Sequence, residues 1–221
     1  MNYLELVNNV LVRLREAEVT APTDTPYSKL ISTFVNDAKR YVEDSFQWNA
    51  LTQTIDVPTA PNLFNYVLGN TSGTEGAGQR FRVMDVVHSQ SDYFLTPKTS
   101  SEMNQLLLTG TPQKGQPTYY NFNGVDINGN TQVDLYPIPD SIQNIFFNLY
   151  VPQRDLTDAS TILFVPPEPV LKYAYAMAVA ERGEDGGISS QEATSLAATS
   201  LADHIAMAES RQNDQYIWAA V

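Results

Sequence analysis

The fold is decided by residues 1–20, MNYLELVNNVLVRLREAEVT. Apolar residues recur there at helical spacing and predict an amphipathic helix with one apolar stripe, formed by Leu4, Val7, Leu11 and Leu14. Polar residues such as Glu5 lie away from this stripe. Because a short amphipathic helix gains most of its stability from packing, other parts of the chain must cover the stripe.

Residues 25–46, TPYSKLISTFVNDAKRYVEDSF, predict the first packing partner. Thr25 is a typical N-cap residue, and Pro26 suits the first helical position. The predicted buried stripe of this helix consists of Leu30, Phe34, Ala38, Tyr41 and Val42. The connection, residues 20–25, is short and polar, so we expect the two helices to form an antiparallel hairpin.

From about residue 51 the apolar spacing changes from helical to alternating, which predicts β-strands. Segments rich in β-forming residues are TQTIDV (52–57), LFNYVL (63–68) and RFRVMDVVH (80–88). The interval 69–79 contains four glycines, but their spacing does not match a phosphate-binding loop. We therefore predict a mobile hairpin loop in this interval.

A tight hairpin is predicted at Asn128 and Gly129, because Asn-Gly between alternating segments favours a turn with positive φ. The further predicted strands are residues 118–127, 131–138 and 141–152. Residues 100–108, SSEMNQLLL, predict a short helix capped by Ser101. We expect about five to seven strands, antiparallel because their connections are short.

Helices return after a proline cluster. Residues 165–183, VPPEPVLKYAYAMAVAERG, predict a helix that ends at Gly183. Residues 189–210, SSQEATSLAATSLADHIAMAES, predict a second helix that begins with a capping box of Ser189 and Glu192. The apolar residues that repeat along it are Ala193, Ala197, Leu201, Ile205 and Ala208. So much alanine allows close approach, so we expect a second helical hairpin.

This order of elements predicts an α+β fold. The N- and C-terminal helices are expected to form one helical bundle, with an antiparallel β-sheet or sandwich inserted between them. The expected domains are residues 1–50 with 166–221 for the bundle and its C-terminal arm, and residues 51–165 for the inserted β module.

The composition of the chain argues against several classes of function. The chain has 13 basic and 25 acidic residues, a net charge of −12, which works against a DNA-binding role because phosphate binding needs clustered Lys and Arg. It has no cysteine, which excludes disulfides and thiolate metal sites. No stretch approaches the roughly 20 apolar residues of a membrane span, and Glu5 interrupts any secretory signal. We expect a protein made and used inside a cell, without a membrane role.

Motifs for catalysis are weak. His88 and His204 belong to no metal or catalytic pattern, so we interpret both as structural or surface residues. A Ser-His-Asp site stays an alternative, because its members meet only in space. Another alternative is a carbohydrate-binding or hydrolytic β module with Asp85 and Asp92 as acid and base. Residues 126–131, DINGNT, partly match a calcium loop, but the glycine position favours a hairpin turn.

Two segments suggest binding instead. The loop ERGEDGG (181–187) has three carboxylates and an arginine, which indicate either a helix end with a solvated connector or a site for a cation or basic partner. The tail SRQNDQYIWAAV (210–221) contains an apolar cluster of Tyr216, Ile217 and Trp218. Burial of such a cluster is worth several kcal/mol at about 25 cal/mol per Å². The tail therefore either folds back onto the bundle or docks on another chain.

Three of these segments resemble a known group. YLELVNNVLVRLRE (3–16), LKYAYAMAVAERGEDGG (171–187) and LADHIAMAE (201–209) followed by a terminal tryptophan are similar in type and order to the head-to-tail adaptor, or connector, proteins of tailed bacteriophages. This group includes the tail tubular protein A type of short-tailed phages. The likeness covers both helical ends, and the β middle fits in its general plan.

The resemblance implies a structural virion protein, not an enzyme, made in the host bacterial cytoplasm and placed at the head–tail interface without a cofactor. It implies a homo-oligomeric ring, generally of twelve copies. Its partners would be the portal protein and the tail nozzle or next tail protein, with tail fibres left open. DNA would pass through an acidic lumen without specific binding, because like charges repel.

Two candidate sites follow from the same resemblance. A portal-docking arm would include Arg211, Tyr216, Ile217 and Trp218. A corner loop near a subunit interface would include Arg182, Gly183, Glu184 and Asp185. The opening helix would pack with the C-terminal helices inside one subunit. A tail-completion or tail-terminator protein is the alternative within the same class.

Overall fold

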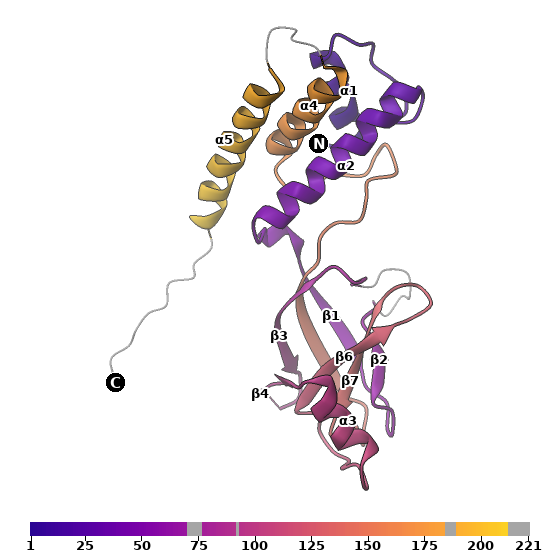
Figure 1. Ribbon diagram of the computed structural model, residues 1–221. Helices are drawn as coiled ribbons and strands as arrows, with labels where there is room; N and C mark the ends of the chain where they lie inside the picture. Colours follow the sequence, from indigo (N-terminus) through magenta and orange to yellow (C-terminus); the bar gives the residue numbers. More distant parts are fainter. Residues whose placement is uncertain (70–76, 92, 184–188, 212–221) are drawn as a thin grey trace, which may run out of the picture. The chain divides into compact units, whose positions relative to one another are not determined.

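The computed structural model describes residues 1–69, 77–91, 93–183 and 189–211. The chain divides into two compact units (Figure 1). The helical unit contains residues 1–51 and 152–221, and the β unit contains residues 52–151. The fold is therefore α+β with helices at both ends of the chain. Residues 152–165, which the sequence analysis placed with the β module, belong to the helical unit.

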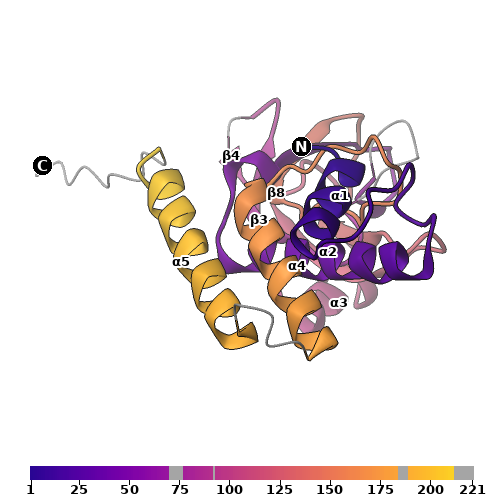
Figure 2. The same ribbon diagram turned by 90° about the horizontal axis from the view of Figure 1, so that it is seen from above.

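The helical unit is built around α4. Its helices are α1 (Tyr3–Arg13), α2 (Pro26–Ser45), α4 (Pro167–Arg182) and α5 (Ser190–Glu209), with a short 3₁₀ turn, η1 (Asn49–Leu51). α4 contacts α1, α2 and α5, so helices from both ends of the chain form one bundle. In both views α5 lies beside α4, on the side away from α1 (Figures 1 and 2).

The buried face of α1 is wider than the predicted stripe, because the helix packs against both α2 and α4. Val7, Leu11 and Leu14 are buried as predicted, but Leu4 is only half-buried. Further buried residues on this helix are Tyr3, Leu6 and Val10. The opening helix thus has its partners within the subunit.

The predicted stripe of α2 is partly wrong. The buried apolar residues are Ile31, Val35, Ala38 and Val42. Leu30 and Phe34 are half-buried, and Tyr41 is 52% exposed. Ala38 and Val42 are buried as predicted, but Ile31 and Val35 are buried in place of the residues one position earlier, about 100° away around the helix. Two apolar stripes coexist on α2, and packing against α1 and α4 decides which one is buried.

The helix ends agree with local sequence signals. Thr25 caps α2 with Pro26 at its first position, and Gly183 ends α4 in the left-handed conformation at φ 63°. The Ser189 side chain accepts a hydrogen bond from the Glu192 backbone and caps α5. On α5 the predicted Ala193, Ala197 and Leu201 are buried, whereas Ile205 and Ala208 are half-buried.

The chain returning from the β unit binds to the helical unit through its backbone. Asn36 on α2 accepts a hydrogen bond from the Leu156 amide (2.8 Å) and donates one to the Leu156 carbonyl (3.1 Å). The Tyr3 amide donates to the Thr161 carbonyl at 2.9 Å. These bonds between distant segments explain why residues 152–165 belong with the helices rather than with the strands.

A buried ion pair strengthens this attachment. Lys39 Nζ lies 3.2 Å from Glu43 Oε1, and both side chains are 0% exposed. Lys39 also donates to the Gln153 carbonyl (2.6 Å), and the Gln153 amide donates to Glu43 (3.1 Å). The pair is therefore hydrogen-bonded to the returning chain as well as internally, which is what a buried charge pair needs to be tolerated.

The β unit is a sandwich of two four-stranded sheets. The first has the order β1-β8-β3-β4, with bounds Thr52–Pro58, Asn144–Tyr150, Arg82–His88 and Tyr93–Phe94. The second has the order β2-β7-β6-β5, with bounds Asn65–Val67, Thr131–Tyr136, Tyr119–Val125 and Thr96–Pro97. Apolar residues of both sheets form one core, in which the rings of Tyr120 and Phe147 lie 6.0 Å apart.

The strand prediction is confirmed in part. The β6–β7 hairpin forms at the predicted turn, where the Asp126 side chain accepts hydrogen bonds from the Asn128 and Asn130 amides. Within the described residues there are eight strands rather than five to seven, and β5 pairs with β6 in parallel. The extra strands, β4 and β5, have two residues each, too short for a periodic signal. The predicted glycine loop lies mostly outside the described residues.

A short helix, α3 (Ser100–Leu108), covers part of the second sheet, with Met103, Leu107 and Tyr136 buried together. The predicted cap is wrong by two residues. Thr99 caps the helix, with a reciprocal hydrogen-bond pair to Glu102, whereas Ser101 lies inside the first turn. Thr99 is selected because Glu102 lies three residues after it, as a capping box requires.

Candidate functional site

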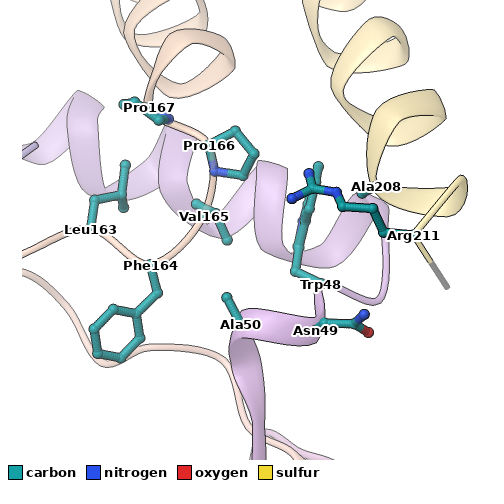
Figure 3. Close-up of a pocket in the computed structure, with 10 residues that line it drawn as sticks. All are labelled: Trp48, Asn49, Ala50, Leu163, Phe164, Val165, Pro166, Pro167, Ala208 and Arg211. Atoms are coloured by element: carbon teal, nitrogen blue, oxygen red, sulfur yellow. The ribbon is translucent and has the colours of Figure 1, made fainter.

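A pocket of about 370 Å³ lies within the helical unit (Figure 3). Its lining comes from the loop after α2, the segment that enters α4 and the last turn of α5. These segments are far apart in the sequence, so only the folded bundle creates the pocket. Its size lies within the range of pockets that bind small ligands or side chains.

The pocket has a buried apolar floor and an exposed rim. Trp48, Leu163 and Val165 are buried, and the Trp48 indole donates a 2.8 Å hydrogen bond to the Val42 carbonyl. On the rim, the side chain of Phe164 is 56% exposed. An apolar side chain entering from the rim would therefore meet preformed apolar surface, which favours binding.

The candidate portal-docking arm begins at this pocket. Arg211 is exposed, follows α5 and lines the pocket together with Ala208 (Figure 3). The other three arm residues, Tyr216, Ile217 and Trp218, lie outside the described residues. The sequence analysis predicted the arm from the family resemblance, but it did not predict the pocket that Arg211 lines.

The first residue of the candidate corner loop is fixed inside its own subunit. Arg182, at the end of α4, donates to the Tyr27 hydroxyl (2.6 Å) and to the Leu14 carbonyl (3.2 Å), and forms an ion pair with Glu16. Burial raises the pKa of Tyr27, which keeps the phenol neutral. Arg182 thus joins three helix ends. Gly183 is the helix cap, and Glu184 and Asp185 lie outside the described residues.

We expect Arg182→Lys to lower the free energy of unfolding by about 1–2 kcal/mol, because an ammonium group cannot reproduce the planar, several-armed contacts of the guanidinium. Chemical denaturation followed by circular dichroism at 222 nm measures this loss. Arg13→Lys, an exposed position on α1, is the control and should be neutral within about 0.5 kcal/mol. Equal effects of the two substitutions would contradict the joining role of Arg182.

Both histidines have structural contacts, in agreement with their interpretation. His88 is fully buried, with Nε2 2.7 Å from Gln143 Oε1 and its ring stacked on Tyr93. His204 lies with Nδ1 2.8 Å from the Ser200 carbonyl one turn earlier in α5. The two belong to different units.

The carboxylates considered for other chemistry have local hydrogen-bond partners. Asp85 accepts a hydrogen bond from the Asn148 side chain, and Asp126 belongs to the β6–β7 turn. Asp92 lies outside the described residues. Among the described residues there is no group of three or more potential metal-binding side chains. No helix in the described parts is long and apolar enough to span a membrane.

Residues 1–219 match the SU10 adaptor protein family, and the chain therefore belongs to this family. The family implies a structural role as a phage head–tail adaptor, located in the virion at the head–tail junction. It also implies assembly with phage head and tail proteins. No curated protein matches the chain.

Proposed function

We propose that the protein assembles as a ring, generally of twelve copies, between the portal and the tail of the virion, as the tail tubular protein A type of adaptor does. The observation that supports this most is the family match over residues 1–219. In this role the helical unit meets the portal through the arm that starts at Arg211. The β unit meets the tail nozzle or the next tail protein.

Exposed apolar side chains on the β unit support a binding role for it. Ile127, at the turn of the β6–β7 hairpin, is 100% exposed, Ile142 is 70% exposed and Phe94 on β4 is 68% exposed. Side chains of this size and exposure lose little by contact with a partner and gain the free energy of burial. We propose that the tail protein covers one or more of these side chains.

The peripheral helix α5 supports contact between copies in the ring. Leu196 and Met207 on α5 are 50% and 52% exposed, and the helix packs mainly on α4. A ring requires one patch of a subunit to meet a different patch of its neighbour. We propose that the outer face of α5, with the corner loop at residues 182–185, forms one of these patches.

The net charge of −12 fits a channel through which DNA slides. A basic lumen would hold the phosphates through release of counterions, whereas an acidic lumen repels them. α5 contributes Glu192, Asp203 and Glu209 and contains no Lys or Arg. DNA therefore passes without specific binding in this proposal.

The direct test mixes the purified protein with its portal ring and images the product by electron microscopy. The expected result is added ring density under the portal, with the subunit number readable from its symmetry. Portal rings without added density would overturn the proposal. Density on isolated tail tubes instead would favour a tail-completion or tail-terminator protein.

A truncation that ends at Ser210 tests the arm. We expect the portal affinity to fall about tenfold or more, because a few aromatic anchors that become buried on binding contribute most of the binding free energy of many interfaces. Surface plasmon resonance on immobilised portal measures this. Gln212→Ala with Asn213→Ala is the matched control, because it changes the arm but keeps its apolar cluster. If the truncated protein bound the portal with unchanged affinity, residues 211–221 would not contribute to portal binding.

A further inference from the structure

The described chain ends at the wall of the pocket. Ala208 and Arg211 line it, and both belong to the last turn of α5 or directly follow it. Arg211 thus lines the same pocket as Trp48 and Phe164, and ten further residues, 212–221, follow it in the sequence. From Arg211 to Tyr216 the chain can span up to about 18 Å, so the apolar cluster reaches the pocket without stretching.

The chemistry of this segment fits the pocket. QNDQYIWAAV contains one charged residue, Asp214, and its middle is Tyr216, Ile217 and Trp218. The pocket offers buried apolar surface from Trp48 and Val165 and an exposed ring from Phe164. Before the cluster the segment contains Asn213 and Asp214, residues that favour turns and so allow the chain to reverse direction.

We propose that this pocket is the docking site for the chain's own residues 212–221, with Ile217 and Trp218 as its anchors. The tail docks on the subunit to which it belongs. The same apolar residues that would otherwise be in water then cover Phe164 and close the rim of the pocket.

The tail should dock on its own subunit rather than on a second copy, because its effective concentration at its own pocket is higher. A segment attached five residues from its site has an effective concentration in the millimolar range, far above that of separate subunits in a micromolar solution. A second copy would have to bind about a thousand times more tightly to compete at that concentration. The tail and the pocket are therefore partners before any ring exists.

Docking of the tail would also affect assembly, and this effect rests on the proposed function. If residues 212–221 form the portal-docking arm, the tail must leave the pocket when the portal binds. An isolated subunit then keeps its anchors covered, and only the portal exposes them. The pocket and its occupant can be tested without any portal, so failure of this inference and failure of the proposed function are separate results.

The test uses the absence of native cysteine. The double variant Ala50→Cys with Ala219→Cys places one thiol at the pocket and one beside Trp218. A disulfide forms only when the two Cα atoms come within about 7 Å. Mild oxidation at micromolar protein concentration, non-reducing electrophoresis and peptide mapping measure the rate and the product.

The matched control is Ala198→Cys with Ala219→Cys. Ala198 is exposed on α5 and does not line the pocket. It lies about 20 Å along the helix from Arg211, within the reach of about 28 Å that eight extended residues allow. The rate of each pair with Ile217→Ala and Trp218→Ala added measures how often an undocked tail reaches that position.

We expect the Ala50→Cys pair to form an intramolecular disulfide about tenfold or more faster than the control pair, since docking raises the local thiol concentration. Adding Ile217→Ala and Trp218→Ala should remove this advantage. Equal rates for both pairs would overturn the proposal. A disulfide that links two subunits would also overturn it and would indicate docking on a second copy.

A second measurement uses the two tryptophans. In ¹⁵N-tryptophan-labelled protein, truncation after Arg211 should shift the indole signal of Trp48, which lies in the pocket. Removal of residues 219–221 alone keeps the anchors and should leave this signal in place. An unchanged Trp48 signal after the longer truncation would overturn the proposal.

Discussion

Glu43→Gln is expected to lower the free energy of unfolding by about 3–5 kcal/mol, because it removes the carboxylate charge that lies 3.2 Å from the buried Lys39 ammonium. Both side chains of the pair are 0% exposed, so water cannot replace the lost carboxylate. The substitution should also weaken the attachment of the returning chain, because Glu43 accepts a hydrogen bond from the Gln153 amide. Urea denaturation followed by circular dichroism at 222 nm measures the change in the free energy of unfolding.

The chain contains a matched control for this substitution. Lys172 and Glu168 on α4 also form an i,i+4 ion pair, at 2.8 Å, but their side chains are 31% and 54% exposed. Glu168→Gln should therefore cost less than about 1 kcal/mol. The double variant Lys39→Met with Glu43→Leu should recover much of the stability, because it removes both buried charges. Equal losses for the two Glu→Gln substitutions would show that burial of the pair does not matter.

Phe147→Ala is expected to cost about 3–5 kcal/mol in the β unit, because it removes a large side chain from the core and leaves a cavity. Phe147 is 0% exposed on β8, the strand that pairs with both β1 and β3. Its ring also contacts Tyr120 of the second sheet. Hydrogen exchange measured by mass spectrometry should show faster exchange in peptides from β8, β1 and β3.

Phe94→Ala is the control, since it deletes the same side chain at a position that is 68% exposed. Its effect on stability should be within about 0.5 kcal/mol. If Phe147→Ala left exchange in β8 unchanged, the face-to-face packing of the two sheets would be wrong. A large loss from Phe94→Ala would instead mean that β4 is covered in solution, as in an oligomer.

The sequence predicted the tail cluster and the loop after α4 as binding segments, because an apolar cluster and a charge-rich helix end are local patterns. The pocket was missed, because Trp48, Phe164 and Arg211 come from three segments that meet only in the bundle. The proline cluster before α4 was the one sequence signal near it, and it was interpreted only as the start of a helix.

By itself the sequence determined the elements whose causes are local. Caps such as Thr25 and Gly183, the Asn128-Gly129 turn and the periodicity of the helices depend on residues a few positions apart, so they can be read along the chain. The order of the elements also predicted that the helices of both ends of the chain pack together.

Only the tertiary structure decided which of two stripes on α2 is buried, and why Lys39 can lie in the core. The stripe is selected by packing against α1 and α4, and the burial of Lys39 depends on the returning chain at Gln153, 114 residues away along the sequence. The same holds for β8, which pairs with β1 across a register that joins Thr52 to Tyr150. Long-range pairing and burial follow from which surfaces meet, and local propensity does not contain that information.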